Sequence, residues 1–103
     1  ITHSPPKNYI KGEKIYLSCK FVTNKKLVGY INFREVNQLK KWSRKKLTKI
    51  KGVFKSVIPN RFTNTNYPIQ YYFEFTDKKH SRFSPGFNKF LSNQPYYILR
   101  QKL

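Results

Sequence analysis

Residues 69–77 read Ile69-Gln70-Tyr71-Tyr72-Phe73-Glu74-Phe75-Thr76-Asp77. Within this stretch Tyr71, Phe73 and Phe75 occupy every second position, so an extended backbone would carry all three rings on one face. Two lysines follow Asp77 and mark a polar turn at which the run ends. The pattern therefore predicts a β-strand whose aromatic face packs against a core.

The same alternation recurs on both sides of this stretch. Apolar residues repeat with a period of two over residues 15–21, 29–33 and 54–58, and a shorter run begins at Tyr96. Proline and asparagine clusters separate the runs, and such spacing predicts an all-β fold. We expect an antiparallel β-sandwich of about seven strands. The residues predicted to face its core are Ile15, Leu17, Ile31, Phe33, Phe54, Ile58, Tyr71, Phe73 and Phe75, with Cys19 as a small buried hydrophobic residue.

The segment from Val36 to Ile50 allows two interpretations. Its apolar residues partly fit the period of about 3.6 that is typical of a helix, but Ser43 and Thr48 interrupt that pattern. A solvated edge strand around Trp42 fits equally well, because lysines on an edge strand discourage pairing with other chains. We favour the strand.

Length and composition point to one domain. The chain has 103 residues, near the commonest domain size, so residues 1–103 are expected to form a single module. It opens at Ile1 without methionine, as a segment excised from a larger multi-domain protein would. No stretch approaches the roughly 20 apolar residues that span a membrane, so no insertion is expected. The single cysteine excludes an internal disulfide and a multi-cysteine metal site, and we predict no cofactor.

The charge balance is strongly one-sided. The chain has 22 lysines and arginines against 4 acidic residues, a formal net charge of +18. Self-repulsion at such a charge opposes compaction, so a polyanionic partner is the first function to consider. AT-rich codons, which encode lysine, are the alternative source of the positive charge, although they do not explain the scarcity of acidic residues.

The positive charge is concentrated around the only tryptophan. Seven cations fall within the twelve residues from 40 to 51, and such a strip attracts sulfate or phosphate groups. Aromatic rings beside it could stack on a sugar or a base. The candidate ligand-binding residues are therefore Trp42, Lys40, Lys41, Arg44, Lys45, Lys46, Lys49 and the outward-phase Tyr72. The alternatives are a core tryptophan with a solvated flank of lysines, and tyrosines that pack against the parent protein.

Catalysis is not expected. A glycosidase needs two carboxylates across a cleft, and Glu35 and Glu74 could in principle face one another on adjacent strands. Among so many lysines, charge compensation is the simpler role for them. His3 and His80 are isolated in terminal or turn segments and have no partner at metal-ligand spacing.

The order of short motifs along the chain resembles a known group of modules. The motifs are Thr2-His3-Ser4-Pro5-Pro6, Gly12-Glu13-Lys14-Ile15, Val28 to Arg34, Gly52-Val53-Phe54, Ile69 to Asp77, Ser84-Pro85-Gly86-Phe87 and Gln94-Pro95-Tyr96-Tyr97-Ile98-Leu99. Together they resemble the immunoglobulin-like or fibronectin-III-like β-sandwich modules that are appended to secreted bacterial polysaccharide-degrading enzymes. The resemblance covers nearly the whole chain, but those modules are near neutral or acidic and this one is basic.

What the resemblance implies is a non-catalytic accessory module in a secreted, cell-surface or periplasmic protein. Combined with the charge, it favours binding or docking on an anionic polysaccharide, either sulfated or uronic. The first alternative is a purely structural spacer that docks against the rest of its own multi-domain chain. The second is nucleic-acid binding through the basic surface, for which no recognised motif is present.

Overall fold

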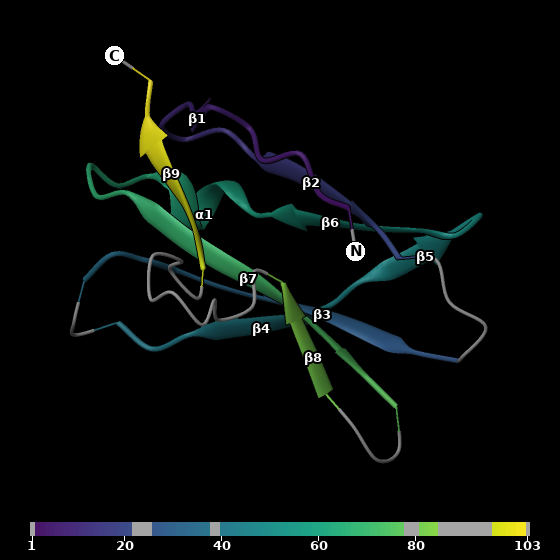
Figure 1. Cartoon of the computed structure of the whole chain (residues 1–103). Helices are drawn as coiled ribbons and strands as arrows, with labels where there is room; N and C mark the ends of the chain where they lie inside the picture. The colour runs from purple at the N-terminus through teal and green to yellow at the C-terminus, as the bar shows by residue number, and fades with distance from the viewer. Residues whose placement is uncertain (1, 22–25, 38–39, 78–80, 85–95, 103) are drawn as a thin grey trace, which may run out of the picture.

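A computed structural model describes residues 2–21, 26–37, 40–77, 81–84 and 96–102. They form an all-β structure of two sheets, seen as two layers in Figure 1. The strands in these ranges are β1 (Asn8–Tyr9), β2 (Ile15–Lys20), β3 (Val28–Glu35), β4 (Ser43–Lys46), β5 (Thr48–Ile50), β6 (Val53–Ile58), β7 (Ile69–Thr76), β8 (Ser81–Ser84) and β9 (Tyr97–Gln101), with one short helix, α1 (Asn60–Thr63). The predicted turns at residues 78–79 and 85–86, and His80, lie outside the described ranges.

The larger sheet has the order β1-β9-β7-β3-β4, with β8 also paired to β7, and the smaller sheet has the order β2-β6-β5. Every pairing between these strands is antiparallel except that of β1 with β9, which is parallel. The described strands number more than the predicted seven partly because β4 and β5, which are one continuous run of chain, belong to different sheets.

The core lies between the sheets and is rich in aromatic rings. All nine residues predicted to face inward are buried, with exposed fractions of 5% or less, and Cys19 is buried beside them. The period-two prediction of strand phase is therefore confirmed for β2, β3, β6 and β7. In the run that begins at Tyr96 the phase is the opposite one, since Leu99 is buried and Ile98 only partly so. Burial raises the pKa of the Cys19 thiol to about 11, so the thiol stays protonated and unreactive near neutral pH.

The chain crosses from one sheet to the other at Leu47. Its side chain is buried and its amide donates to the Gly29 carbonyl at 2.7 Å. A Cβ on Gly29 would lie 2.9 Å from Leu47 Cδ1 and 3.0 Å from Phe75 Cε1, so this crossing requires glycine at position 29. The strand interpretation of this region is confirmed for residues 43–46 and 48–50, and the helical one is wrong.

The N-terminal segment is fixed to the core by His3. The interpretation of His3 as an isolated residue is wrong, because its ring packs edge-on against Phe73 with centroids 4.8 Å apart. Its Nδ1 lies 2.6 Å from the Ser18 carbonyl oxygen, which can only accept, so Nδ1 carries the proton. Nε2 then accepts the hydrogen bond from the Tyr71 hydroxyl at 2.7 Å. Burial lowers the pKa of His3, which keeps the ring neutral.

Candidate functional site

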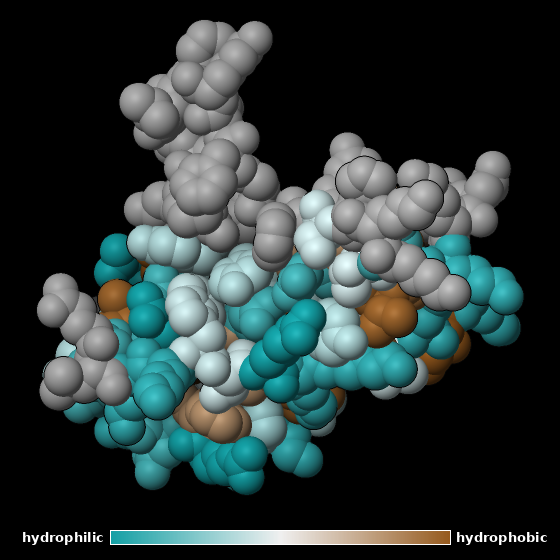
Figure 2. All heavy atoms as spheres, turned by 90° about the horizontal axis from the view of Figure 1, so that it is seen from below, coloured by the Kyte–Doolittle hydropathy of each residue, from teal (hydrophilic) through white to brown (hydrophobic). Residues whose placement is uncertain are grey.

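The outer face of the larger sheet carries the residues that alternate with the core positions. On β3 these are Tyr30, Asn32 and Arg34, and on β7 they include Tyr72 and Glu74. Seen from the side of β4 and β8, the molecule is mainly hydrophilic, with paler areas of intermediate hydropathy between the strongly polar ones (Figure 2). This face therefore mixes charged groups with amphipathic rings.

Arginines and aromatic rings are interleaved on this face. The Arg34 guanidinium lies 4.4 Å from the Trp42 ring centroid, and Trp42 meets Tyr72 edge-on with centroids 5.0 Å apart. The Arg44 guanidinium lies 3.7 Å from the Tyr30 ring centroid. Such cation–π contacts hold planar cations and rings in fixed relative positions. We refer to these five residues as the aromatic strip.

A carboxylate lies beside the strip. Arg44 Nη2 donates to Glu74 Oε1 at 3.1 Å, and a guanidinium has further N–H donors in the same plane. Burial, and then the nearby Glu74 charge, raises the pKa of Tyr72, so its hydroxyl stays protonated. Tyr72 can therefore act as a hydrogen-bond donor as well as a flat surface.

A basic pocket of about 410 Å³ opens next to the strip. It is formed by the end of β3, the connection to β4 and the region of α1, and its cationic lining residues are Arg34, Lys40, Lys41 and Arg61. Glu35 also lines it and pairs with Lys40 at 3.7 Å. Four cations against one carboxylate leave the pocket with an excess of positive charge.

Arg34 joins the pocket to the aromatic strip. Its Nε donates to Gln70 Oε1 at 2.6 Å and its Nη1 donates to the Lys40 carbonyl oxygen at 3.2 Å, while its guanidinium plane stacks on Trp42. The pocket and the strip therefore form one continuous surface, which we call the basic-aromatic surface.

The predicted site residues do not all lie on this surface. Trp42, Tyr72, Arg44, Lys40 and Lys41 are brought together there, and Lys46 lies at its margin, opposite Tyr30 in the β-sheet register.

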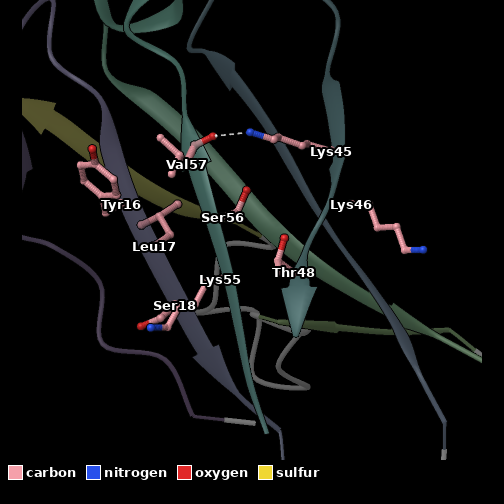
Figure 3. A pocket seen from close by; sticks show the side chains of 9 residues that line it. All are labelled: Tyr16, Leu17, Ser18, Lys45, Lys46, Thr48, Lys55, Ser56 and Val57. Carbon is pink, nitrogen blue, oxygen red and sulfur yellow. Dashed lines mark hydrogen bonds between the residues drawn. The ribbon is translucent and has the colours of Figure 1, made fainter. Parts of the chain in front are cut away.

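Two of the predicted lysines are elsewhere. Lys45 points to the other side of β4 and donates to the Val57 carbonyl oxygen at 3.2 Å (Figure 3). Lys49, on β5, lies with its Nζ 5.5 Å from the Phe54 ring centroid. Side chains alternate between the two faces of β4, and the chain changes sheet at Leu47. The cations of residues 40–51, which are close together in the sequence, therefore lie on different parts of the surface.

Three residues of the surface were missed by the sequence interpretation. Tyr30 lies on the outward-facing positions of the alternating run 29–33, and Arg34 continues the same alternation. The period of two could therefore have identified both residues. Arg61 reaches the pocket through α1, and no sequence pattern placed that segment beside Lys41.

The acidic and metal-ligating side chains of the described residues are not clustered. Those residues contain no group of three or more histidine, cysteine or acidic side chains that could hold a metal ion. Glu35 lies opposite Ile69 and Glu74 lies opposite Tyr30, so the two carboxylates do not face one another. Each pairs with a cation instead, as expected for charge compensation. No helix in the described part of the chain is long and apolar enough to cross a membrane.

Comparison with known proteins gives no match to this chain. No protein-family model, curated protein or solved structure is significantly similar to it.

Proposed function

We propose that this chain is a non-catalytic accessory module that binds anionic polysaccharide, sulfated or uronic, through the basic-aromatic surface. The observation that supports this most is the position of Arg34, which stacks on Trp42 and also lines the basic pocket. Rings and cations are thereby held side by side on one face, as a ligand with both sugar rings and acidic groups requires.

The cations and the aromatic rings of the surface would bind different parts of the polysaccharide. Guanidinium groups form paired, charge-assisted hydrogen bonds with sulfate or carboxylate. Tyr72 and Trp42 offer apolar ring surface to the C–H face of a sugar, while Lys40 and Lys41 add long-range attraction. An unselective nucleic-acid binder would also use cations and rings, so discrimination between polymers is the property to measure.

We further propose an immunoglobulin-like, fibronectin-III-like topology for the module. In that fold the strands are ordered ABED in one sheet and CFG in the other. The order β2-β6-β5, with Thr2 bridged to β2, fits ABED, and β3-β7-β9 fits CFG, with β4 as an additional strand. The chain departs from antibody domains in having one cysteine and no tryptophan on β3. A secreted, cell-surface or periplasmic location belongs to the same proposal.

A structural docking module is the second candidate, and one observation favours it. Trp42 is half-buried, because Arg34, Tyr72 and Tyr96 already surround its ring. Such packing reduces the ring area that a sugar could reach. A spacer would need the same residues only for stability.

Affinity electrophoresis separates these functions. The protein is run through gels that contain dextran sulfate, polygalacturonate, single-stranded DNA or neutral dextran. We expect retardation by the acidic polysaccharides, less by DNA and none by dextran, and a steep loss of retardation with added salt because bound cations release counterions.

Any protein of charge +18 will adhere to a polyanion, so two double variants that each remove two positive charges are compared. Arg34→Gln/Lys41→Gln removes two charges from the surface, and Lys7→Gln/Lys102→Gln removes two from the region of β1 and β9. Because a hydrogen bond to a charged group contributes roughly 1.5–3 kcal/mol, the first pair should weaken binding at least about tenfold more than the second. Equal losses would show diffuse charge without a site and would favour the spacer.

A further inference from the structure

The outer face of the smaller sheet is open along all three of its strands. Residues that lie directly opposite one another in the register share a face of the sheet. The register therefore places eight side chains on the outer face, namely Tyr16, Ser18 and Lys20 from β2, Val53, Lys55 and Val57 from β6, and Thr48 and Ile50 from β5. All eight are exposed or partly exposed, so no described element covers this face.

Half of these outward side chains are apolar. Tyr16 is 72% exposed and lies beside Val57, and the two project from neighbouring strands in Figure 3. Ile50 is 50% exposed and lies beside Val53 on the same face. The solvent-facing side of an antiparallel sheet is normally polar. Apolar groups gathered on one exposed face therefore indicate a contact surface.

The charged residues of this face are all lysines. Lys20 and Lys55 are exposed on it, and the Lys45 ammonium group lies at its edge, 3.2 Å from the Val57 carbonyl oxygen. None of the strands β2, β5 and β6 contains an acidic residue. A lysine packs its aliphatic stem along apolar surface and extends its charge beyond it. The face is therefore apolar at its base and cationic at its tips.

This combination fits a lipid surface better than a protein or a polysaccharide. Protein interfaces are enriched in arginine and depleted in lysine and serine, whereas the outer face has lysine and serine and no arginine. An anionic lipid surface attracts lysines without requiring fixed hydrogen-bond geometry, and its interfacial region accepts tyrosine and aliphatic side chains. Hydrated polysaccharide offers no comparable apolar region for Ile50 and the two valines.

We propose that the outer face of the smaller sheet binds the surface of an anionic phospholipid membrane. Tyr16 and Ile50 enter the headgroup region, while Lys20 and Lys55 contact lipid phosphates. The protein lies on the bilayer and does not cross it. This inference goes beyond the proposed function and does not depend on it, because the basic-aromatic surface belongs to the other sheet. A module bound in this way keeps the aromatic strip directed away from the membrane.

The test is sedimentation of the protein with vesicles of phosphatidylcholine alone and of phosphatidylcholine mixed with an equal amount of phosphatidylglycerol. We expect binding to the anionic vesicles only, weakened by added salt. Absence of binding to the anionic vesicles would overturn the proposal in favour of an acidic protein partner. Equal binding to both kinds of vesicle would overturn the role of the lysines.

Two double variants control for diffuse charge. Lys20→Gln/Lys55→Gln should weaken vesicle binding by about fivefold for each lysine removed. Arg34→Gln/Lys41→Gln removes the same charge from the basic-aromatic surface. It should weaken vesicle binding by no more than about twofold, because charges on the far sheet lie beyond a Debye length of about 8 Å from the membrane. Equal losses in the two variants would overturn the proposal.

A second matched comparison tests the apolar contact. Tyr16→Ala/Ile50→Ala should weaken vesicle binding at least about tenfold, as expected when two buried apolar groups are lost. Ile10→Ala/Tyr67→Ala removes side chains that are 49% and 52% exposed near the end of β1, and it should leave binding unchanged. All four side chains are exposed, so both variants should fold. Equal binding by the two variants would overturn the apolar contact.

The fluorescence of Trp42 keeps this proposal separate from the proposed function. Trp42 belongs to the aromatic strip of the larger sheet, so its emission should not change when vesicles bind. A shift of that emission on vesicle binding would overturn the assignment of the membrane contact to the smaller sheet. Vesicle binding that persists when dextran sulfate fails to bind would refute the proposed function alone.

Discussion

Replacement of Phe73 by alanine is expected to lower the free energy of unfolding by about 3–5 kcal/mol, the usual cost of removing a buried ring. Phe73 is fully buried in β7, between Ile31 on β3 and Ser84 on β8 in the sheet register. Its ring also meets those of His3 and Tyr97 edge-on. Because β7 has neighbours on both sides, the surrounding strands cannot collapse into the cavity.

The measurement is urea-induced unfolding followed by circular dichroism. Tyr16→Ala is the matched control, since it removes an aromatic ring that is 72% exposed from another strand, and it should change stability by no more than about 0.5 kcal/mol. A loss of less than about 1 kcal/mol for Phe73→Ala would contradict the strand phase on which the whole core depends.

Replacement of His3 by alanine is expected to cost about 2–3 kcal/mol, because it leaves the buried Tyr71 hydroxyl without its acceptor and removes packing from the core. A double-mutant cycle with Tyr71→Phe isolates the hydrogen bond. In the Tyr71→Phe background, His3→Ala should cost at least about 1 kcal/mol less than in the wild type. Additive effects would show that the His3–Tyr71 hydrogen bond contributes nothing.

The same contact predicts a pH dependence. The pKa of His3 is lowered in the folded state, because burial disfavours the charged ring. The unfolded chain then binds a proton at higher pH than the folded one does, so stability rises with pH between the two values. The contribution of His3 is complete above its ordinary pKa of about 6.5 and is lost as the pH falls towards the folded value. His3→Ala should flatten the dependence of the free energy of unfolding on pH in this range. An unchanged dependence would show that His3 is not the group responsible.

The strand phases could be predicted from the sequence because a two-residue period depends only on local geometry. Once Tyr71 and Phe73 face inward, every alternate side chain on β7 faces outward. The same rule identified the core faces of β2, β3 and β6 and the outward direction of Tyr72. It needed no knowledge of which strands are neighbours.

What the sequence could not provide is contact between distant segments. The partnership of His3 with Tyr71 joins residues 68 positions apart, and the cation–π contact of Arg34 with Trp42 depends on the path of the chain between β3 and β4. Lysines adjacent in sequence, such as Lys45 and Lys46, were grouped although alternation sends them to different sides of the strand. A linear count of charge contains none of this information.

The most direct test of the proposed binding surface uses the single tryptophan of the chain, Trp42, as a reporter at its centre. Its fluorescence is measured during titration with dextran sulfate and, in parallel, with neutral dextran. We predict a saturable change with dextran sulfate, no change with dextran, and a response in Arg34→Gln/Lys41→Gln that requires at least about tenfold more polymer. Binding of dextran sulfate with no change at Trp42, or with equal affinity in the double variant, would contradict the account.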